Sequence, residues 1–277
     1  MTPEIRQLTL ADVTELLLWA KAEGWNPGID DAAPFLAADP EGFIGCFVDG
    51  RMAAGLSAVA SGPDFGFIGL YICHPDFRGR GLGRKVWDAG MAHLGSRTAG
   101  LDGVPAQQEN YRSMGFEPAY RTWRYHGRFM PSTSPACVVD IDAGLLPEII
   151  EFDRRHYPGP RPAFLADWIA TPRMARAILR NGRIAAYGVL RKCHQGSKIG
   201  PLFAESEDDA VQIFMALAAC SDGEEIAIDV PEPAAGFSAY LDDLAFQKGF
   251  DTMRMYRGPA PAMNMAGVFG VTTLELG

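Results

Sequence analysis

The sequence has few of the features that mark a secreted, metal-binding or membrane protein. Its cysteines stand singly, without a C-x-x-C pair or a histidine at zinc-ligand spacing, at Cys46, Cys73, Cys137, Cys193 and Cys220. We therefore expect a reducing compartment and no structural metal. No apolar run is long enough to cross a bilayer, and the first residues lead directly into the amphipathic segment 10–19, so no signal peptide and no membrane contact are expected. The predicted location is the cytoplasm.

Positive charge is also scarce, and this argues against a nucleic-acid partner. The chain of 277 residues carries 25 Lys and Arg against 34 Asp and Glu, for a net charge of −9. Proteins that bind nucleic acid gather cations on one face, and neither half of this chain is basic. An acidic surface mildly favours a cationic small molecule by long-range attraction. The oligomeric state stays open.

A glycine-rich turn with arginines built in, residues 78–83 (RGRGLG), is the most informative stretch. The segment 65–72 before it is rich in aromatic and β-branched residues and predicts a strand, which Pro75 ends because proline has no N–H to donate. Apolar residues recur at helical spacing from Leu82 to Leu94 after it. The turn therefore opens a helix, whose unpaired N–H groups and positive dipole end attract an anion.

The composition of the turn favours a phosphate ligand over an ordinary basic strand-to-helix turn, which is the simpler alternative. Glycine at 79, 81 and 83 lets the backbone approach a phosphate closely. A P-loop would need Lys-Ser or Lys-Thr after its last glycine, but Gly83 is followed by Arg84-Lys85. A dinucleotide fingerprint would need the spacing G-x-G-x-x-G within a βαβ unit, and this spacing is not met.

The turn resembles the Arg/Gln-x-x-Gly-x-Gly/Ala motif of the GNAT superfamily of acyl-CoA-dependent N-acyltransferases at every defined position, and residues 74–79 (HPDFRG) are similar to the usual entry to that loop. The resemblance implies acetyl-CoA or another acyl-CoA as co-substrate and no metal. It also implies a set of cofactor-binding residues. They are Ile72, Cys73, His74, Arg78, Gly79, Arg80, Gly81, Leu82, Gly83 and Arg84.

Internal similarity predicts two domains. The hairpin segment 49–55 (DGRMAAG) matches residues 181–188 (NGRIAAYG), and Met114-Gly115-Phe116 matches Lys248-Gly249-Phe250. A proline- and serine-rich stretch at 129–136 predicts the boundary. The expected fold class is α/β, of the mixed α+β kind. It consists of two tandem GNAT-fold domains, each a mixed, mostly antiparallel sheet flanked by helices.

We expect residues 1–130 to form the catalytic domain that binds acyl-CoA and residues 137–277 to form a GNAT-like second domain. The position equivalent to the phosphate loop falls near 201–209 (PLFAESEDD), which has no glycine and four acids that would repel a pyrophosphate. The second domain is therefore expected to lack CoA and to contribute to the acceptor side. The chain resembles a bacterial subgroup of two-domain GNAT proteins with such a degenerate second domain.

Acyl transfer to an amine needs a proton for the departing thiolate, and Tyr111 is the candidate donor. Residues 111–116 (YRSMGF) resemble the superfamily's Tyr-x-x-x-Gly-Phe segment, whose tyrosine protonates the coenzyme sulfur. Without the resemblance, Tyr111 reads as one more half-buried aromatic residue. Val104 and Gln107 depart from the Asn and Ala usual at these positions, so the helix is expected to start differently, with Pro105 as its opening residue.

The other catalytic groups are less defined in the sequence. The resemblance implies that a backbone N–H near Ile72 and Cys73 polarises the thioester carbonyl, with His74 close by. Asp64, Tyr71 and a water relay all remain candidates for the general base.

Two further residue sets are candidates for ligand contact. Segment 23–28 (EGWNPG) breaks a helical pattern and is the expected acceptor loop, so Trp25 and Asn26 are predicted substrate-binding residues; Trp25 as core is an equal alternative. Arg191 follows a strand-like segment, and we prefer an ion pair with an acid such as Asp153 over a role in an interdomain cleft.

The sequence thus predicts an N-acetyltransferase that moves an acetyl or related acyl group from acyl-CoA to a primary amine by direct attack in a ternary complex. Two other functions compete with it. One is a non-catalytic acyl-CoA-binding regulatory module, and the other is a scaffold that binds a small ligand in the cleft of the second domain.

Overall fold

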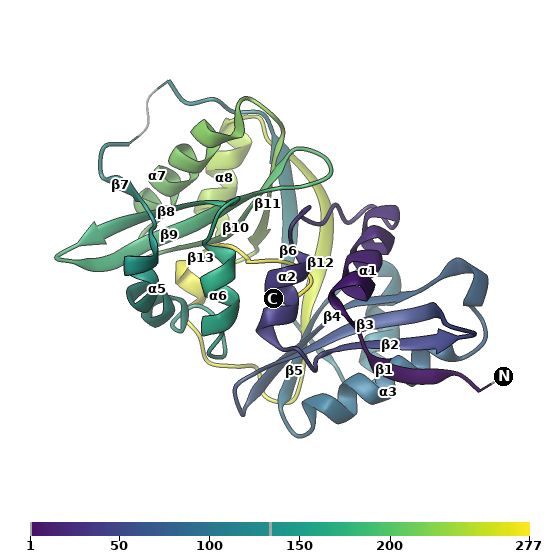
Figure 1. Ribbon diagram of the computed structural model, residues 1–277. Helices are drawn as coiled ribbons and strands as arrows, with labels where there is room; N and C mark the ends of the chain where they lie inside the picture. The colour runs from purple at the N-terminus through teal and green to yellow at the C-terminus, as the bar shows by residue number, and fades with distance from the viewer. Residues whose placement is uncertain (1, 133–134) are drawn as a thin grey trace.

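The computed structural model describes residues 2–132 and 135–277, and it consists of two similar halves built on one continuous sheet (Figure 1). The first half contains β1 (Glu4–Gln7), α1 (Leu10–Ala22), α2 (Ala32–Ala38), β2 (Phe43–Val48), β3 (Arg51–Ser61), β4 (Phe65–Cys73), η1 (Pro75–Phe77), α3 (Leu82–Leu94), β5 (Thr98–Gly103), η2 (Pro105–Gln107), α4 (Gln108–Ser113) and β6 (Glu117–Gly127). The second half contains β7 (Val138–Asp140), η3 (Ala143–Leu145), α5 (Leu146–Asp153), α6 (Pro162–Trp168), β8 (Met174–Arg180), β9 (Arg183–Lys192), β10 (Ser197–Ala204), α7 (Glu207–Ala218), η4 (Ala219–Ser221), β11 (Ile226–Pro231), α8 (Ala235–Asp243), β12 (Gln247–Arg257), η5 (Met265–Gly267) and β13 (Val268–Gly270).

The two halves exchange their long last strands. The strand order is β1-β2-β3-β4-β5-β12-β6-β11-β10-β9-β8-β7, with β13 added beside β10. Strand β12 of the second half therefore pairs with β5 of the first, β6 of the first pairs with β11 of the second, and β6 and β12 pair with each other, all antiparallel. Figure 1 shows these two strands running between the two halves. Backbone hydrogen bonds consequently join the halves without interruption.

The hairpin repeat predicted from the sequence is confirmed. Asp49 and Gly50 connect β2 to β3 with φ of 54° and 77°, and Asn181 and Gly182 connect β8 to β9 with φ of 52° and 75°. Positive φ at both central residues defines the type I′ turn, which favours Asn-Gly and Asp-Gly. The fold class is the expected one, a mixed and mostly antiparallel sheet flanked by helices in each half.

The second sequence landmark of the repeat was wrong. Lys248-Gly249-Phe250 lies exposed within β12 and does not follow a helix. The true counterpart of Gly115-Phe116 is Ala245-Phe246, since both segments end a helix with a residue of positive φ, 86° at Gly115 and 60° at Ala245. Phe116 donates its N–H to the carbonyl of Tyr111, and Phe246 donates to that of Leu241. The sequence match failed because an alanine occupies the left-handed position that usually needs glycine.

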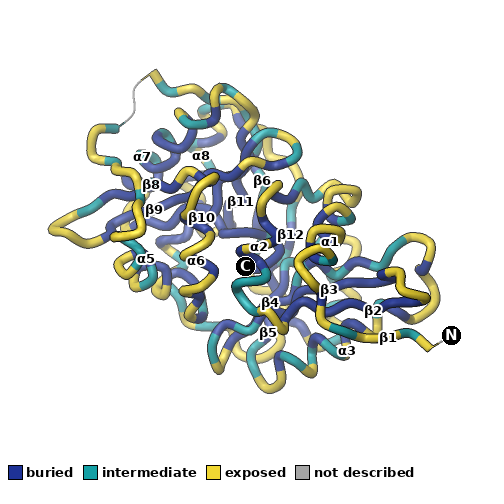
Figure 2. Tube along the Cα trace, in the orientation of Figure 1, coloured by how far each residue is buried: buried dark blue, intermediate teal, exposed yellow. Residues whose placement is uncertain are grey.

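The largest apolar cluster of the described residues contains side chains of both halves. In Figure 2 much of the trace of the central strands is buried. The cluster is built from α1 and α2 of the first half together with α5, α6 and β13 of the second. Phe35 on α2 stacks on Trp168 on α6 with ring centroids 6.0 Å apart, and both side chains are fully buried. Separate clusters lie under α3 and under α7 and α8. None of the helices in the described ranges is long and apolar enough to cross a membrane.

A buried ion pair fixes the exchanged strand β12 to β5. Nε and Nη2 of Arg254 donate to the two carboxylate oxygens of Asp102 at 2.9 Å, and both side chains are almost completely buried. The guanidinium lies 4.9 Å from the centre of the Phe67 ring. Taking both charges out of water is costly, so removing one partner alone leaves the other uncompensated.

We predict that Arg254→Met lowers the free energy of unfolding by about 3–5 kcal/mol, because it leaves the Asp102 carboxylate buried and unpaired. Urea denaturation measures this change. The double variant Asp102→Asn with Arg254→Met should recover much of the loss, and Lys192→Met, which removes a half-exposed pair with Glu224, should cost less than about 1 kcal/mol. Equal losses for Arg254→Met and Lys192→Met would contradict the role of the buried pair.

Candidate active site

The glycine-rich turn lies between η1 and α3, as the sequence predicted. Gly79 and Gly81 have φ of 74° and 73°, and a Cβ added at either would meet no atom within 4 Å. Gly81 is the N-cap of α3, and among the described residues no side chain caps this helix end. The first-turn N–H groups therefore face open space in front of the turn, and this is the geometry of an anion site.

The arginines of the turn have different surroundings. Arg78 donates to the carbonyl of Cys73 at 3.0 Å and to the carboxylate of Glu23 at 2.6 Å, so it braces the turn against β4 and against the end of α1. Arg84 pairs with Asp88 one helical turn later. Arg80 is exposed, with its guanidinium 5.4 Å from the centre of the Phe77 ring.

Strands β4 and β5 separate just before the turn. Their parallel pairing ends at Ile68 and Leu101, although both strands continue beyond it. At the same place β4 carries an extra residue, because Leu70 and Tyr71 stand opposite the single residue Leu56 of β3. Leu70 has a φ of +48°, which bulky residues rarely adopt. The bulge turns the backbone N–H groups of this stretch out of the regular ladder.

The residues expected to surround the thioester carbonyl lie just past this bulge. Ile72 and Cys73 are back in register with Gly55 and Ala54 of β3. His74 accepts a hydrogen bond from the N–H of Asp76 and contacts the Trp19 ring edge-on at 5.2 Å. Burial raises the pKa of the Cys73 thiol, which disfavours a nucleophilic thiolate.

Tyr111 is held in place by the helix end that follows it. The helix segment opens with Pro105, as predicted, but as the 3-10 turn η2, and α4 with Tyr111 follows. Gly115 reverses the chain with its positive φ, so the buried Phe116 packs against Tyr111. The Tyr111 ring also stacks on Trp87 at 5.8 Å. Burial, and next the nearby Tyr71, raise the pKa of Tyr111 to about 12, so its hydroxyl stays protonated at neutral pH.

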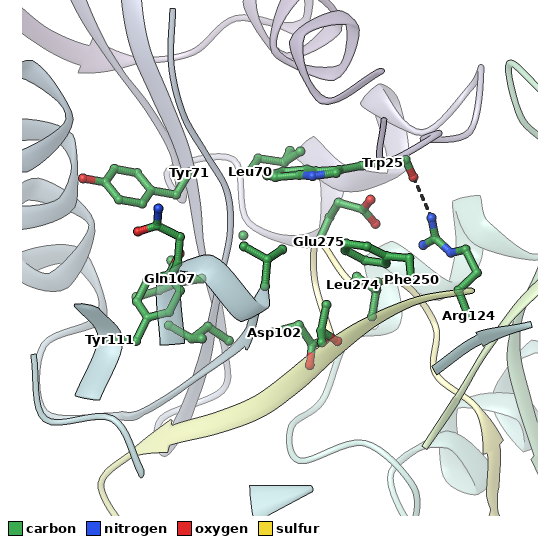
Figure 3. A pocket seen from close by; sticks show the side chains of 15 residues that line it. Trp25, Leu70, Tyr71, Asp102, Gln107, Tyr111, Arg124, Phe250, Leu274 and Glu275 are labelled. Atoms are coloured by element: carbon green, nitrogen blue, oxygen red, sulfur yellow. Dashed lines mark hydrogen bonds between the residues drawn. The ribbon is translucent and has the colours of Figure 1, made fainter. Parts of the chain in front are cut away.

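Tyr111, the bulge of β4 and the C-terminal segment together line a pocket with about 90 Å³ of internal space, shown in Figure 3. Residues from both halves form its walls. They are Trp25, Ile68, Gly69, Leu70, Tyr71, Leu101, Asp102, Val104, Gln107, Tyr111, Arg124, Phe250, Thr252, Leu274 and Glu275. A Cβ at Gly83 would lie 3.0 Å from the Tyr71 hydroxyl, so the pocket adjoins the glycine-rich turn through Tyr71.

The structure separates the two predicted acceptor residues. Trp25 lines the pocket, and its carbonyl accepts hydrogen bonds from Arg124 at 3.0 Å and Lys198 at 3.3 Å. Asn26 instead forms a reciprocal pair of hydrogen bonds with the backbone of Gln195, at 2.8 and 3.0 Å. Asp64 lies exposed at the opposite end of β4 from the bulge, whereas Tyr71 lines the pocket.

The ion pair preferred for Arg191 is confirmed, but its partner is Asp31 and not the suggested Asp153. Arg191 donates to the carboxylate of Asp31 and to the carbonyl of Thr272, both at 3.3 Å. Asp153 instead receives two hydrogen bonds from Arg161 at 2.7 and 2.9 Å. Arg191 meets Asp31 because the two halves are in contact here. Asp31 lies just before α2 of the first half, and Arg191 lies in β9 of the second.

The second half repeats the architecture of this site, but the gap between its strands and the N-terminus of its helix are both filled. Strand β10 carries the same bulge, with Gly200 and Pro201 opposite Val189, and its pairing with β11 ends at Ile199. The space beyond is occupied by β13, which pairs with β10. The hydroxyl of Ser206 caps α7, whose first turn carries Glu207, Asp208 and Asp209. Leu241 stands where the first half has Tyr111.

Sequence reasoning missed the part of the pocket that the exchanged strands and the C-terminal segment supply. Arg124 comes from β6, Phe250 and Thr252 from β12, and Leu274 and Glu275 from the segment after β13. Arg124, between Trp123 and Tyr125, was the one sign in the sequence that β6 supplies a polar side chain to a site. Nothing in the residue pattern indicated which half each strand would join.

Two family models match the chain. One, described as the acetyltransferase (GNAT) family, matches residues 10–116, and the other, an acetyltransferase (GNAT) domain, matches residues 149–270. The chain is 34% identical over 263 residues to the holothin acyltransferase of a Pseudoalteromonas strain, covering 94% of this chain and 89% of that protein. An uncharacterised N-acetyltransferase of Bacillus subtilis is 26% identical over 236 residues, covering 80% and 76% of the two chains.

Solved structures share the fold over the whole length. A putative acetyltransferase from Pyrococcus horikoshii superposes with a TM-score of 0.83 at 19% identity and covers 99% of this chain and 96% of its own. A tandem GNAT protein from the clavulanic acid biosynthesis pathway has a TM-score of 0.59 at 15% identity, with 94% and 100% coverage. Together with the two matched domains, these relatives show that the chain belongs to the GNAT acyltransferase family and is a tandem member of it.

Proposed function

We propose that this acyltransferase moves an acetyl or related acyl group from acyl-CoA to a primary amine, with both substrates bound at the same time. The observation that carries the proposal is the position of the pocket. It opens where β4 and β5 separate, it contains Tyr111, and it adjoins the glycine-rich turn through Tyr71. A thioester reaching from the turn between the two strands would meet an acceptor in the pocket.

The turn suits the pyrophosphate of the acyl donor. The N–H groups at the start of α3 are uncapped by side chains in the described part of the chain, and the dipole of the helix adds positive potential there. Arg80 is exposed beside the turn and Arg78 holds it against β4. We assign donor binding to residues 72–74 and 78–84 on this basis.

Two groups of this chain would serve the transfer step. As the amine nitrogen bonds to the carbonyl carbon, negative charge grows on the carbonyl oxygen, and backbone N–H groups at the bulge of β4 would stabilise it. When the carbon–sulfur bond then breaks, the hydroxyl of Tyr111 would give its proton to the sulfur. Its raised pKa keeps that proton available.

The acceptor is proposed to be a small molecule that contacts Trp25. Acyltransferases among the relatives support a small-molecule acceptor, and one of them is named for holothin. The pocket walls combine apolar side chains, such as Leu70 and Phe250, with a few polar groups. Such a lining is typical of small-molecule sites.

We further propose that residues 1–130 bind the acyl donor and that residues 137–277 bind none and shape the acceptor side. Strand β13 occupies the space beside β10 that a donor would need, and Ser206 with three acids replaces the open helix end. A purely regulatory acyl-CoA-binding module is not favoured, since Tyr111 lines a pocket beside the glycine-rich turn and a relative of the chain is an acyltransferase.

Thiol release tests the proposed function directly. Acetyl-CoA is mixed with the protein and a panel of amines, and free CoA thiol is measured with a thiol reagent. We expect release that depends on amine concentration and one donor bound per chain in calorimetric titration. Tight CoA binding with no amine-dependent release would support the regulatory module instead.

We predict that Gly81→Val abolishes CoA binding, because a branched side chain would fill the open space in front of the α3 N-terminus. Calorimetric titration with CoA measures the affinity. Gly50→Val is the matched control, because Gly50 has a φ of 77° and equally open surroundings but lies in the β2–β3 hairpin. Both variants bear similar backbone strain, so the comparison isolates the effect of position. Unchanged CoA affinity in Gly81→Val would show that the turn does not bind the donor.

For Tyr111→Phe we predict a fall in kcat of about 10²–10⁴-fold with little change in acyl-CoA affinity, as expected for the loss of a general acid. Steady-state kinetics and titration separate the two quantities. Tyr240→Phe removes a hydroxyl from α8 and should leave kcat unchanged. With a pKa of about 12, Tyr111 should support turnover up to about pH 10, so a loss of rate near pH 8 that disappears in Tyr111→Phe would contradict the assignment.

A further inference from the structure

The segment that follows β13 leaves the second half and ends against the first. Within it, Val271 donates its N–H to the carbonyl of Asp229 in β11 at 2.9 Å. Four residues later, the carbonyl of Glu275 accepts a hydrogen bond from the side chain of Ser57 in β3 at 3.3 Å. Figure 1 places the C-terminal end of the chain between the two halves. We call residues 271–277 the crossing segment.

The crossing segment is held at nearly every residue. Arg161 donates to the hydroxyl of Thr272 at 2.9 Å, and Tyr157 donates to the carbonyl of Leu276, also at 2.9 Å. The hydroxyl of Thr273 accepts from the N–H groups of Glu275 and Leu276 at 3.2 and 2.8 Å. A Cβ at Gly69 would come within 2.0 Å of the Glu275 carbonyl oxygen, so the segment lies directly on the β4 backbone. Its side chains therefore have fixed positions.

The side chain of Glu275 lacks a partner in this well-ordered setting. Its residue is 3% exposed, its Oε2 is buried, and within residues 2–132 and 135–277 no donor reaches that oxygen. It lines the pocket that Tyr111 lines, and Figure 3 shows its carboxylate among the labelled side chains of Trp25 and Phe250. A buried carboxylate without hydrogen bonds destabilises a fold. Its retention therefore points to a partner that arrives in the pocket.

The other acids near the pocket are already engaged. Both oxygens of Asp102 are held by Arg254 at 2.9 Å. Asp229 receives two hydrogen bonds from Arg124 at 2.7 and 2.9 Å. Each oxygen of these two carboxylates therefore already accepts a hydrogen bond from a guanidinium. Glu275 thus differs from both in having an oxygen free.

The cations around Glu275 have other partners, although Nη2 of Arg191 is buried without one among the described residues. Arg124 pairs with Asp229, Arg191 pairs with Asp31, and Lys198 donates to the Trp25 carbonyl. Each of the three interacts electrostatically with Glu275 without forming an ion pair with it. None of the three occupies the free oxygen of Glu275.

We propose that Glu275 is the catalytic base of the transfer, supplied by the second half to the active site of the first. The proposal rests on the function proposed above. An acceptor ammonium would donate one N–H to Oε2 of Glu275 and lose that proton to it, and the neutral nitrogen would then attack the thioester carbonyl carbon. As the carbon–sulfur bond breaks, Tyr111 gives its proton to the sulfur, and the nitrogen, which still carries two protons, releases one to water to become the amide. The proton held by Glu275 then passes through solvent to the Tyr111 phenolate, which returns both side chains to their starting states.

The test compares Glu275→Gln with the parent protein on two acceptors of similar shape, benzylamine and O-benzylhydroxylamine. The first is an ammonium ion at pH 7 and needs a base, whereas the second is already neutral. We expect kcat/KM with benzylamine to fall about 10²–10⁴-fold. With O-benzylhydroxylamine we expect a loss of less than about tenfold. Glu205→Gln, which removes an exposed carboxylate paired with Arg155, is the matched control and should change neither rate.

Two readouts separate catalysis from structure. Removing an unpaired buried charge should leave the Tm of Glu275→Gln equal to or above that of the parent, with acyl-CoA affinity unchanged. Equal losses with both acceptors, or a lowered Tm, would make Glu275 structural and overturn the proposal. If the parent protein transfers to amines and Glu275→Gln does so equally well, only the base assignment fails. If the parent shows no amine-dependent thiol release, the proposed function fails with it.

Discussion

The antiparallel pairing of β6 with β12 is the constraint on which the rest of the molecule depends. Each strand is the last long strand of its own half and the central partner of the other. A chain with this exchange cannot separate its halves without breaking two further ladders, β5 with β12 and β6 with β11. The pocket is consequently a property of the whole sheet, since part of its lining comes from residues on the exchanged strands.

Two of the buried ion pairs lie where the exchanged strands meet their partners in the other half. Asp102 and Arg254 join β5 to β12, and Arg124 and Asp229 join β6 to β11. Each of the two pairs thus connects an exchanged strand to its new neighbour in the other half. Because one partner alone is strongly disfavoured in the interior, these pairs specify which strand sits beside which. A purely apolar interface would tolerate a shifted register more easily.

Much of the donor side was predictable from local sequence, because its parts are neighbours along the chain. Each of its parts is encoded within a few residues. These parts are the turn at 78–83, the helix after it, the opening proline at 105 and the helix end at Gly115-Phe116. Of the pocket walls beyond β4 and the Tyr111 helix, the sequence predicted only Trp25. Arg124 and Phe250 reach the pocket through strand pairings across more than a hundred residues, and Glu275 reaches it through the crossing segment, and no local pattern encodes either arrangement.

The errors have the same origin. Asp153 was expected to pair with Arg191, but the contact of α2 with α6 brings Asp31 to Arg191 instead. The match of Lys248-Gly249-Phe250 to the first half relied on a glycine, while Ala245 adopts the required left-handed conformation without one. In both cases the tertiary arrangement overrode a reasonable local expectation.

The anchoring of the Trp25 loop has a consequence for how such an enzyme changes over evolution. The loop belongs to the first half, but Asn26 is bound to the backbone at Gln195, and Lys198 holds the Trp25 carbonyl from β10. Mutations in the β9–β10 region can therefore move Trp25 and reshape the pocket while every residue of the glycine-rich turn stays unchanged. The anchors of the Trp25 loop and the glycine-rich turn lie on different segments of the chain, so the shape of the pocket can change during evolution without a change in the turn.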